Sequence, residues 1–461
     1  MQHFGFIDFL LAPLVLFLIY AFARQIMQKN IQEFPEYRYF LMGLSVKIIG
    51  AITLCVIYGL YYNGGDTMNY YRDAVVMLKL LGKNPTGFYE VIFSGPAKKN
   101  WLYFDGDTGW PHYFNDKPTF MVVRIVCIIV LISFKSIIVS NIVMATLSFI
   151  GIWKMYKVFV MEFPTLTREL AIAILFIPSV FFWGSGILKD TITFSMIGFY
   201  LHSFYFLFVK RKFGLTRVFV LYCSTYIILL IKPYIILALI TSSTVWLAMM
   251  YISKIKGGIA RTAVAPVLII IGAFLGYIFI NSLGSQLGLY AIDKVLERAV
   301  ITQRDLKAEY YGGNSFDIGE FDATFSSMLE KAPIAIASAL FRPTILEVNN
   351  PVMLISALEN LVLLIFAIRI IIRTRIIGIF RFFTKHHLLT FSIVFSVFFA
   401  FSVGISTSNF GSLVRYRIPI LPFFVASLYI ISYYYDLASA KKKEALRIDF
   451  EQMANKGKIV V

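Results

Sequence analysis

Charged residues are scarce in this chain of 461 residues, in which Asp, Glu, Lys and Arg make up 15% of the sequence and hydrophobic residues 59%. Apolar runs long enough to cross a hydrocarbon core of ~30 Å recur from one end of the chain to the other. No water-soluble domain needs that pattern. The composition therefore predicts a polytopic membrane protein.

Cysteine is also rare, since the chain has only Cys55, Cys127 and Cys223. All three lie in or beside apolar segments, without a CxxC pair or metal-ligand spacing, which indicates packing residues. Low-complexity tracts and internal repeats are absent as well. No stretch combines a basic start, a short apolar region and a small-residue cleavage site, so we expect the first apolar helix to be retained.

Positive charge exceeds negative charge, with 43 Lys and Arg against 26 Asp and Glu, a formal net charge of +17. In a soluble protein this excess would raise nucleic acid as a partner. Here the cations lie in short loops or the tail beside apolar segments, as the positive-inside rule describes. We therefore expect anionic membrane lipids as their partners and no nucleic acid. The main clusters are 210–212, 254–261, 369–385 and 441–443.

Hydropathy predicts about eleven membrane-spanning helices. A further apolar run, 120–133, is short and carries Arg124 near its middle. The basic clusters after 209, 251 and 371 are expected on the cytoplasmic side. Counting spans backward from these clusters and forward from the N-terminus gives the same sides for the loops only if this run does not cross, and instead lies in the interface or re-enters. The N-terminus is then outside and the C-terminus inside, with a twelve-span arrangement as the alternative. The expected spans are 5–23, 39–62, 137–155, 170–188, 191–209, 218–231, 233–251, 263–280, 351–371, 388–405 and 418–435.

The predicted fold class is thus an all-α polytopic membrane protein with amphipathic juxtamembrane helices in its first outer loop. Both long polar segments fall on the outer side, where irregular backbone can meet water. The parts are the first two spans (1–62), an outer loop with amphipathic and surface or re-entrant helices (63–136), membrane helices (137–280), a second outer loop (281–350), C-terminal membrane helices (351–435) and a basic cytoplasmic tail (436–461).

Asp66 follows two glycines directly after the second expected span. The glycines allow a sharp exit from the helix, which holds Asp66 at the membrane surface beside a rigid element. Apolar residues then recur at helical spacing from Tyr71, as in a helix that lies on a membrane. Asp66 is therefore either the cap of this surface helix, a reactive carboxylate, or both.

Asp105 and Asp107 form an Asp-Gly-Asp triplet in the same loop. Two neighbouring carboxylates suit Mg²⁺ or Mn²⁺, which makes such a metal the one cofactor that the sequence offers. A simple turn is the alternative, because Asp and Gly favour turns for backbone reasons.

Several cations are expected at the outer level, against the positive-inside trend. Arginine binds phosphate through two parallel hydrogen bonds, so these cations fit a lipid-linked phosphate, with a salt-bridge network as the alternative. The candidate phosphate or lipid-carrier ligands are Arg72, Lys189, Lys232, Arg342, Arg415 and Arg417, and the supporting polar residues are Asp190, Glu347, Asn409 and Tyr416.

In these features the chain resembles the GT-C superfamily of membrane glycosyltransferases, of the bacterial polysaccharide-assembly type. The resemblance is one of pattern over nearly the whole chain, and the extra helix before the acidic loop departs from the simplest family pattern. It is carried by the acidic loop from Gly65 to Asp73, by Lys189 and Asp190 after Pro178, and by the run from Arg415 to Pro419.

The resemblance implies an inverting transfer of a hexose or pentose from a polyprenyl-phosphate carrier to a glycan, lipid or protein acceptor. It implies a bacterial inner membrane, with the active face periplasmic or extracellular. Asp66 matches the general base of the family and Asp73 is the second candidate. The cations would stabilise the phosphate leaving group.

Two other functions fit a chain of this kind. A polymerase or ligase of O-antigen type would show an arginine-rich outer loop, but Arg298, Arg304 and Arg342 are well separated within 281–350. A transporter of lipid-linked oligosaccharides would usually show repeated halves and ionisable residues near mid-membrane. Lys47 is the lone charge well inside an expected span.

Overall fold

The structure is a computed structural model, which describes residues 4–252, 297, 300–305, 314–383 and 386–455. These residues are almost entirely helical and form no strand, apart from an isolated bridge between Ser315 and Asn409. The all-α prediction is confirmed.

Within these residues, eight helices are long and apolar enough to cross a membrane, which supports a multi-pass membrane protein. The expected number of about eleven is not reached. The expected span 263–280 lies outside the described residues, and α10 (Leu215–Ile231) is apolar but shorter. The eight are α1 (Phe6–Asn30), α2 (Phe40–Val56) with its flanking turns η1 (Pro35–Tyr39) and η2 (Ile57–Tyr61), α6 (Ile137–Glu162), α9 (Lys189–Phe204) with η5 (Tyr205–Val209), α11 (Pro233–Ile252), α17 (Pro351–Phe383), α18 (His387–Ser406) and α20 (Ile420–Asn455).

The single span expected over 170–188 consists of two short helices, α7 (Thr167–Leu175) and α8 (Pro178–Trp183). Proline has no N–H to donate and disfavours a helical residue before it. Accordingly Ile177 is extended, with φ −68° and ψ 121°, and the helix ends before Pro178. The expectation of one continuous helix is wrong here.

The short apolar run around Arg124 forms α5 (Lys117–Ile132), which is not among the eight membrane-crossing helices. α5 packs against α3 (Asp66–Lys83), and together they form a second apolar core that includes Met77, Val123 and Cys127. Arg124 donates a hydrogen bond to the carbonyl of Val91 at 3.3 Å. That this run does not cross the membrane stays a prediction.

Polar caps set where several helices begin around this second core. Asn84, Asp116 and Ser136 each accept a hydrogen bond from the backbone N–H three residues on, at the starts of α4 (Pro85–Ser94), α5 and α6. Asn, Asp and Ser are the residues best suited to that position. The remaining short elements are η3 (Lys98–Tyr103), η4 (Pro164–Leu166), α15 (Phe325–Glu330), α16 (Ala332–Phe341), η8 (Ile345–Glu347) and α19 (Phe410–Tyr416).

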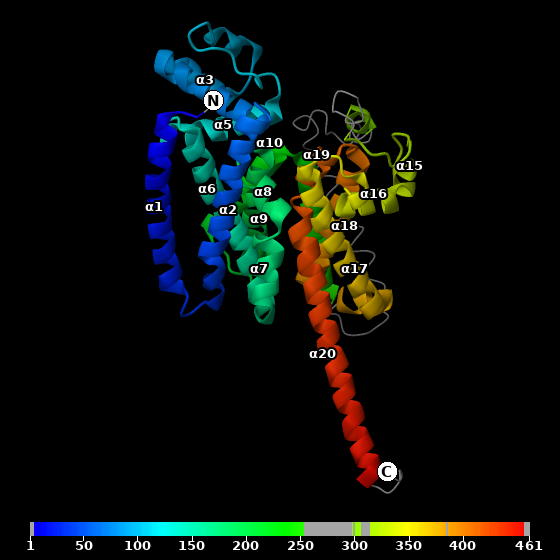
Figure 1. Ribbon diagram of the computed structural model, residues 1–461. Coiled ribbons are helices and arrows are strands. Elements are labelled where there is room, and N and C mark those ends of the chain that lie inside the picture. The colour runs from blue at the N-terminus through cyan, green and yellow to red at the C-terminus, as the bar shows by residue number, and fades with distance from the viewer. Residues whose placement is uncertain (1–3, 253–296, 298–299, 306–313, 384–385, 456–461) are drawn as a thin grey trace.

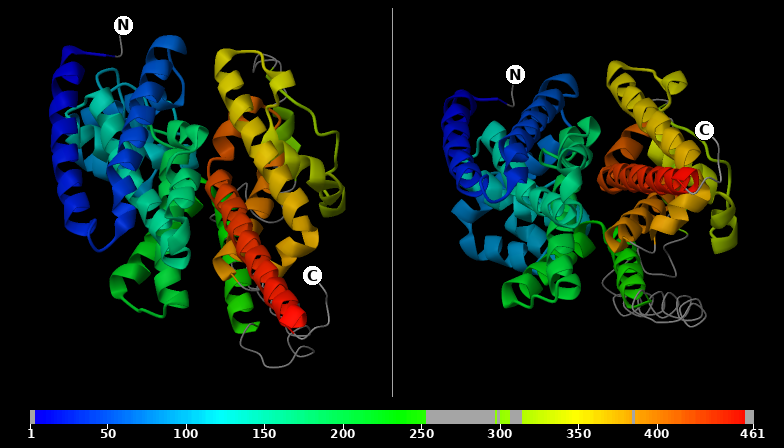
Figure 2. Two further views of the ribbon diagram at one scale, coloured as in Figure 1. Left: turned by 60° about the horizontal axis from the view of Figure 1, so that its bottom comes forward. Right: turned by 90° about the horizontal axis from the view of Figure 1, so that it is seen from below.

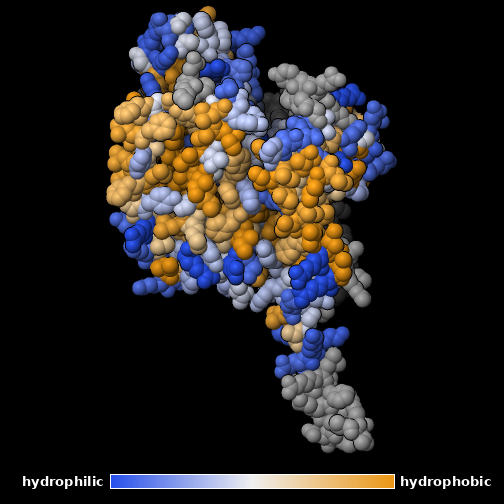
Figure 3. Space-filling model, in the orientation of Figure 1, coloured by the Kyte–Doolittle hydropathy of each residue, from blue (hydrophilic) through white to orange (hydrophobic). Residues whose placement is uncertain are grey.

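The helices form two groups that lie side by side, one with α1, α2 and α6–α10 and the other with α11, α16–α18 and α20 (Figure 2). In the first group the backbones of α6 and α9 are in close contact at Gly151 and Gly198. A Cβ added to Gly198 would lie only 2.0 Å from the carbonyl oxygen of Gly151. Small residues at such crossings are typical of membrane helices. The face drawn in Figure 3 carries an apolar band between hydrophilic residues at its two ends, as a bilayer requires.

Both long polar segments lie at one end of the bundle. α3 and α15 are found at that end, where α1 also begins, whereas the end of α20 projects beyond the opposite end (Figure 1). The structure therefore brings the described parts of 63–136 and 281–350 to the same side, as the topology argument predicted.

Candidate functional site

Six charged side chains gather at this end, where α3, α5, α9, α19 and the turn between α10 and α11 meet. We call them the charged cluster: Asp66, Asp116, Lys189, Asp190, Lys232 and Arg415. Three are acidic and three basic, so the cluster is formally neutral.

Asp66 begins α3, directly after Gly65, whose φ of +99° is one that residues with a side chain rarely adopt. An Arg415 nitrogen donates to one carboxylate oxygen at 2.7 Å, and the Tyr113 hydroxyl donates to the other at 3.1 Å. Burial raises the pKa of Asp66, but the charge of Arg415 and these hydrogen bonds outweigh burial and hold the pKa below its usual value. Asp66 is therefore a carboxylate at neutral pH.

Asp190 and Lys232 form a buried ion pair, with side chains 1% and 8% exposed. Asp190 lies in the first turn of α9, and Lys232 follows the last residue of α10. Arg415 also lies 3.5 Å from the second carboxylate oxygen of Asp190, so its guanidinium bridges Asp190 and Asp66. Such buried charges persist only when each has a partner.

Lys189 completes the cluster from the neighbouring position on α9. It donates a hydrogen bond to the hydroxyl of Thr119 and lies 3.8 Å from Asp116, both at the start of α5. Its charge also helps to lower the pKa of Asp66, after the larger effects of burial and Arg415. Four of the predicted site residues, together with Arg415, thus share one electrostatic environment: Asp66, Lys189, Asp190 and Lys232.

Asp73 is fully buried two turns along α3. Its two carboxylate oxygens accept hydrogen bonds from the backbone N–H groups of His112 and Tyr113, both at 2.8 Å. Burial raises the pKa of Asp73, and these two bonds oppose that rise. The contacts make Asp73 an anchor for the 109–113 segment, which carries the Tyr113 hydroxyl to Asp66.

Arg342 and Arg417 were expected with the other cations but form a separate network. Arg417 is fully buried, donates to the carbonyl of Arg342 at 2.8 Å and lies 3.9 Å from Glu359. Arg342 lies 3.3 Å from Glu347. These contacts tie the end of α16 and α17 to the α19–α20 turn. Two nitrogens of Arg417, Nε and Nη2, have no hydrogen-bond partner among the described residues.

The other supporting residues have distinct places. Asn409 caps α19 by accepting a hydrogen bond from the N–H of Ser412 at 3.2 Å. The ring of Tyr416 lies 4.7 Å from the ammonium of Lys232, so Tyr416 packs on the charged cluster. Arg72 is exposed on α3.

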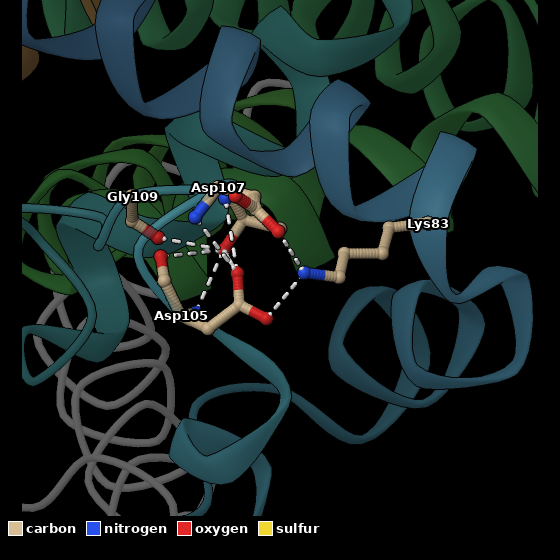
Figure 4. Close-up of polar contacts among 5 residues, drawn as sticks. Lys83, Asp105, Asp107 and Gly109 are labelled. Atoms are coloured by element: carbon tan, nitrogen blue, oxygen red, sulfur yellow. Dashed lines mark hydrogen bonds and ion pairs between the residues drawn. The ribbon is translucent and has the colours of Figure 1, made fainter.

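Asp105 and Asp107 face Lys83, whose ammonium lies 2.6 and 2.5 Å from their carboxylate oxygens (Figure 4). Asp105 also accepts hydrogen bonds from the backbone N–H groups of Asp107 and Thr108. The ammonium occupies the place that a divalent cation would take, so these residues do not fit a metal. Among the described residues no group of three or more His, Cys, Asp or Glu could hold a metal ion.

Tyr58, Tyr113, Asp116 and Thr119 were not singled out from the sequence. Tyr113 and the 116–119 turn could have been found only by their nearness to the Asp105 triplet along the chain. Tyr58 gave no signal, because tyrosines near the ends of membrane helices are common as interfacial anchors. In the structure the Tyr58 hydroxyl lies within electrostatic range of Arg415.

Comparison with known proteins gives no family for this chain. No model of a known protein family, no curated protein and no solved structure matches it. The geometry of the charged cluster is therefore what supports a function.

Proposed function

We propose that the protein is a membrane glycosyltransferase of GT-C type, which moves a sugar from a polyprenyl-phosphate carrier to a glycan, lipid or protein acceptor. The observation that carries the proposal is the pair of Asp66 and Arg415, a carboxylate held ionised against an arginine at 2.7 Å. Two further cations, Lys189 and Lys232, belong to the same cluster. A base and several phosphate ligands are what this reaction needs.

Each group has a step in the reaction. Asp66 takes the proton of the acceptor hydroxyl while the hydroxyl oxygen bonds to the anomeric carbon of the sugar. The bond from that carbon to the phosphate oxygen breaks, and the oxygen keeps the electron pair. Arg415, Lys189 and Lys232 stabilise the charge that develops on the phosphate, an effect that is large where water is excluded.

The neutrality of the cluster links donor binding to the activity of the base. Arg415 contacts Asp66 and Asp190 through one terminal nitrogen, whereas its Nε has no hydrogen-bond partner among the described residues and is available to a phosphate oxygen. A phosphate bound there shares the positive charge that lowers the pKa of Asp66, so that pKa rises. A base with a pKa closer to neutral accepts a proton more readily, so the bound donor prepares Asp66 for the acceptor.

The placement of the cluster supports a role at the membrane surface. It lies at the end of the bundle where both long polar segments lie, level with the ends of membrane-crossing helices such as α9 (Figure 1). A lipid carrier keeps its phosphate at that depth and its chain among the apolar helices. We place this face on the periplasmic or extracellular side of a bacterial cytoplasmic membrane, in cell-surface polysaccharide or glycoconjugate assembly.

The test is the variant Asp66→Asn in proteoliposomes supplied with a radiolabelled polyprenyl-phosphate sugar and an acceptor glycan. We expect transfer to fall by about 10²-fold or more, since that is the usual contribution of a general base. Asp107→Asn is the matched control, because Asp107 is exposed in the same polar segment, and it should keep full transfer. Full transfer by Asp66→Asn would refute Asp66 as the base.

The products of the same assay separate two chemistries. A single added sugar supports a transferase. A ladder of repeat units would instead support a polymerase of O-antigen type.

A further inference from the structure

Tyr58 lies in an irregular turn at the end of its helix. The last turn of the second membrane helix, η2, is π-helical over Ile57–Tyr61. Such wide turns are rare and frequently lie at functional sites. Tyr58 is 8% exposed, whereas Tyr61 and Tyr62 on the same helix end are 68% and 50% exposed. The turn thus separates one inward tyrosine from two outward ones.

The Tyr58 ring packs against the residue that precedes Asp66. A Cβ on Gly65 would lie 2.5 Å from a carbon of this ring, so only glycine fits there. The N–H of Gly64 also donates to the carbonyl of Tyr58 at 3.0 Å. The ring contact and this backbone hydrogen bond together hold Tyr58 beside the start of α3.

The Tyr58 hydroxyl is a donor that the described residues leave unused. It lies within electrostatic range of Arg415, Asp66 and Asp190, yet it makes no hydrogen bond to any residue in the described part of the chain. The Tyr113 hydroxyl differs, because it donates to Asp66. Tyr70 also lies within electrostatic range of Asp66 without a hydrogen bond to a described residue, but it is 2% exposed against 8% for Tyr58. The Tyr58 hydroxyl is therefore the donor more open to a ligand.

We propose that the Tyr58 hydroxyl donates a hydrogen bond to the phosphate of the lipid carrier, next to Arg415. The proposal rests on the proposed function and names a further ligand of its donor. Hydrogen bonds from a neutral hydroxyl to an anionic oxygen are short and strong. Because the cluster is already neutral, such a donor binds phosphate without taking a cation from its carboxylate. Tyr58 is then a catalytic residue, since it touches the leaving group.

The test compares Tyr58→Phe with Tyr61→Phe in the purified full-length protein. The phenylalanine keeps the ring on Gly65 and removes only the hydroxyl, and Tyr61 is an exposed control on the same turn. The probes are farnesyl phosphate and farnesol, which share a chain and differ in the phosphate. We expect Tyr58→Phe to weaken binding of farnesyl phosphate by about 10-fold, the usual effect of a hydrogen bond to a charged group. Farnesol binding and the control variant should be unchanged.

The outcomes separate this proposal from the proposed function, because binding is measured without transfer. Equal affinities of the wild-type protein and Tyr58→Phe for farnesyl phosphate would overturn it. Equal weakening for both probes would also overturn it, since that result shows a packing role of the ring. A wild-type protein that fails to bind farnesyl phosphate would overturn it as well. A phosphate-dependent loss in Tyr58→Phe supports the proposal, even if the wild-type protein transfers no sugar and the proposed function fails.

Discussion

The buried pair of Asp190 and Lys232 leads to a specific expectation about stability. Lys232→Met removes the charge and keeps most of the apolar length of the side chain. Asp190, which is 1% exposed, would then keep Arg415 at 3.5 Å as its cation. Removal of one partner of a buried pair costs about 3–5 kcal/mol, and since Arg415 still balances part of the charge, we expect about 2–3 kcal/mol.

The double variant of Asp190→Asn with Lys232→Met should recover most of this loss. Both charges are then gone, and replacement of a whole buried pair is often close to neutral. We expect the double variant to be within about 1 kcal/mol of the wild-type protein. With Lys232→Met alone at about 2–3 kcal/mol, the coupling between the two positions is at least about 1 kcal/mol, and any cost of Asp190→Asn alone adds to it. Such a coupling would identify the pair as one energetic unit.

The measurement is the free energy of unfolding of the detergent-solubilised protein, followed by tryptophan fluorescence during denaturant titration. Lys210→Met is the control, because its contact with Glu162 joins side chains that are 43% and 31% exposed, and it should cost less than about 1 kcal/mol. Additive effects of the two single changes would refute the reasoning. A double variant less stable than either single one would refute it as well.

Two other results are expected. Arg415→Gln removes the cation that holds the pKa of Asp66 down, so burial then raises that pKa and the acidic limb of the residual transfer activity moves to higher pH; a limb that stays in place would contradict this. In a variant without the three native cysteines, new cysteines at Leu102 and Phe213, both exposed, should react with an impermeant maleimide from opposite sides of the membrane. Labelling from the same side would contradict the arrangement of helices.

Hydropathy predicted the long helices because membrane-crossing segments depend mainly on the average character of some twenty residues. The same averaging failed over 170–188, where a single residue, Pro178, divides an apolar run that otherwise reads as one span. For the run around Arg124 the charge count, and not hydropathy, led to the prediction that it does not cross. The run forms α5, which is 16 residues long and packs against α3.

The membership of the site was partly predictable, but its pairing was not. Asp66, Lys232 and Arg415 were expected at one level, and they do meet. Which carboxylate pairs with which cation depends on helix packing, which no local pattern encodes. Arg415 and Arg417 show the limit most clearly. Helical residues two positions apart point about 200° apart, and the two guanidiniums reach different networks.

The distance along the chain between Asp66 and Arg415, 349 residues, has a consequence for biogenesis. Asp66 leaves the ribosome long before Arg415 is synthesised. Asp190 likewise precedes its partner Lys232, by 42 residues. During this interval the carboxylates need water, lipid headgroups or the insertion machinery to compensate their charge. The site is complete only when the last membrane helices are in place, so a chain released early carries its acidic groups into the membrane surface without the arginine that holds them.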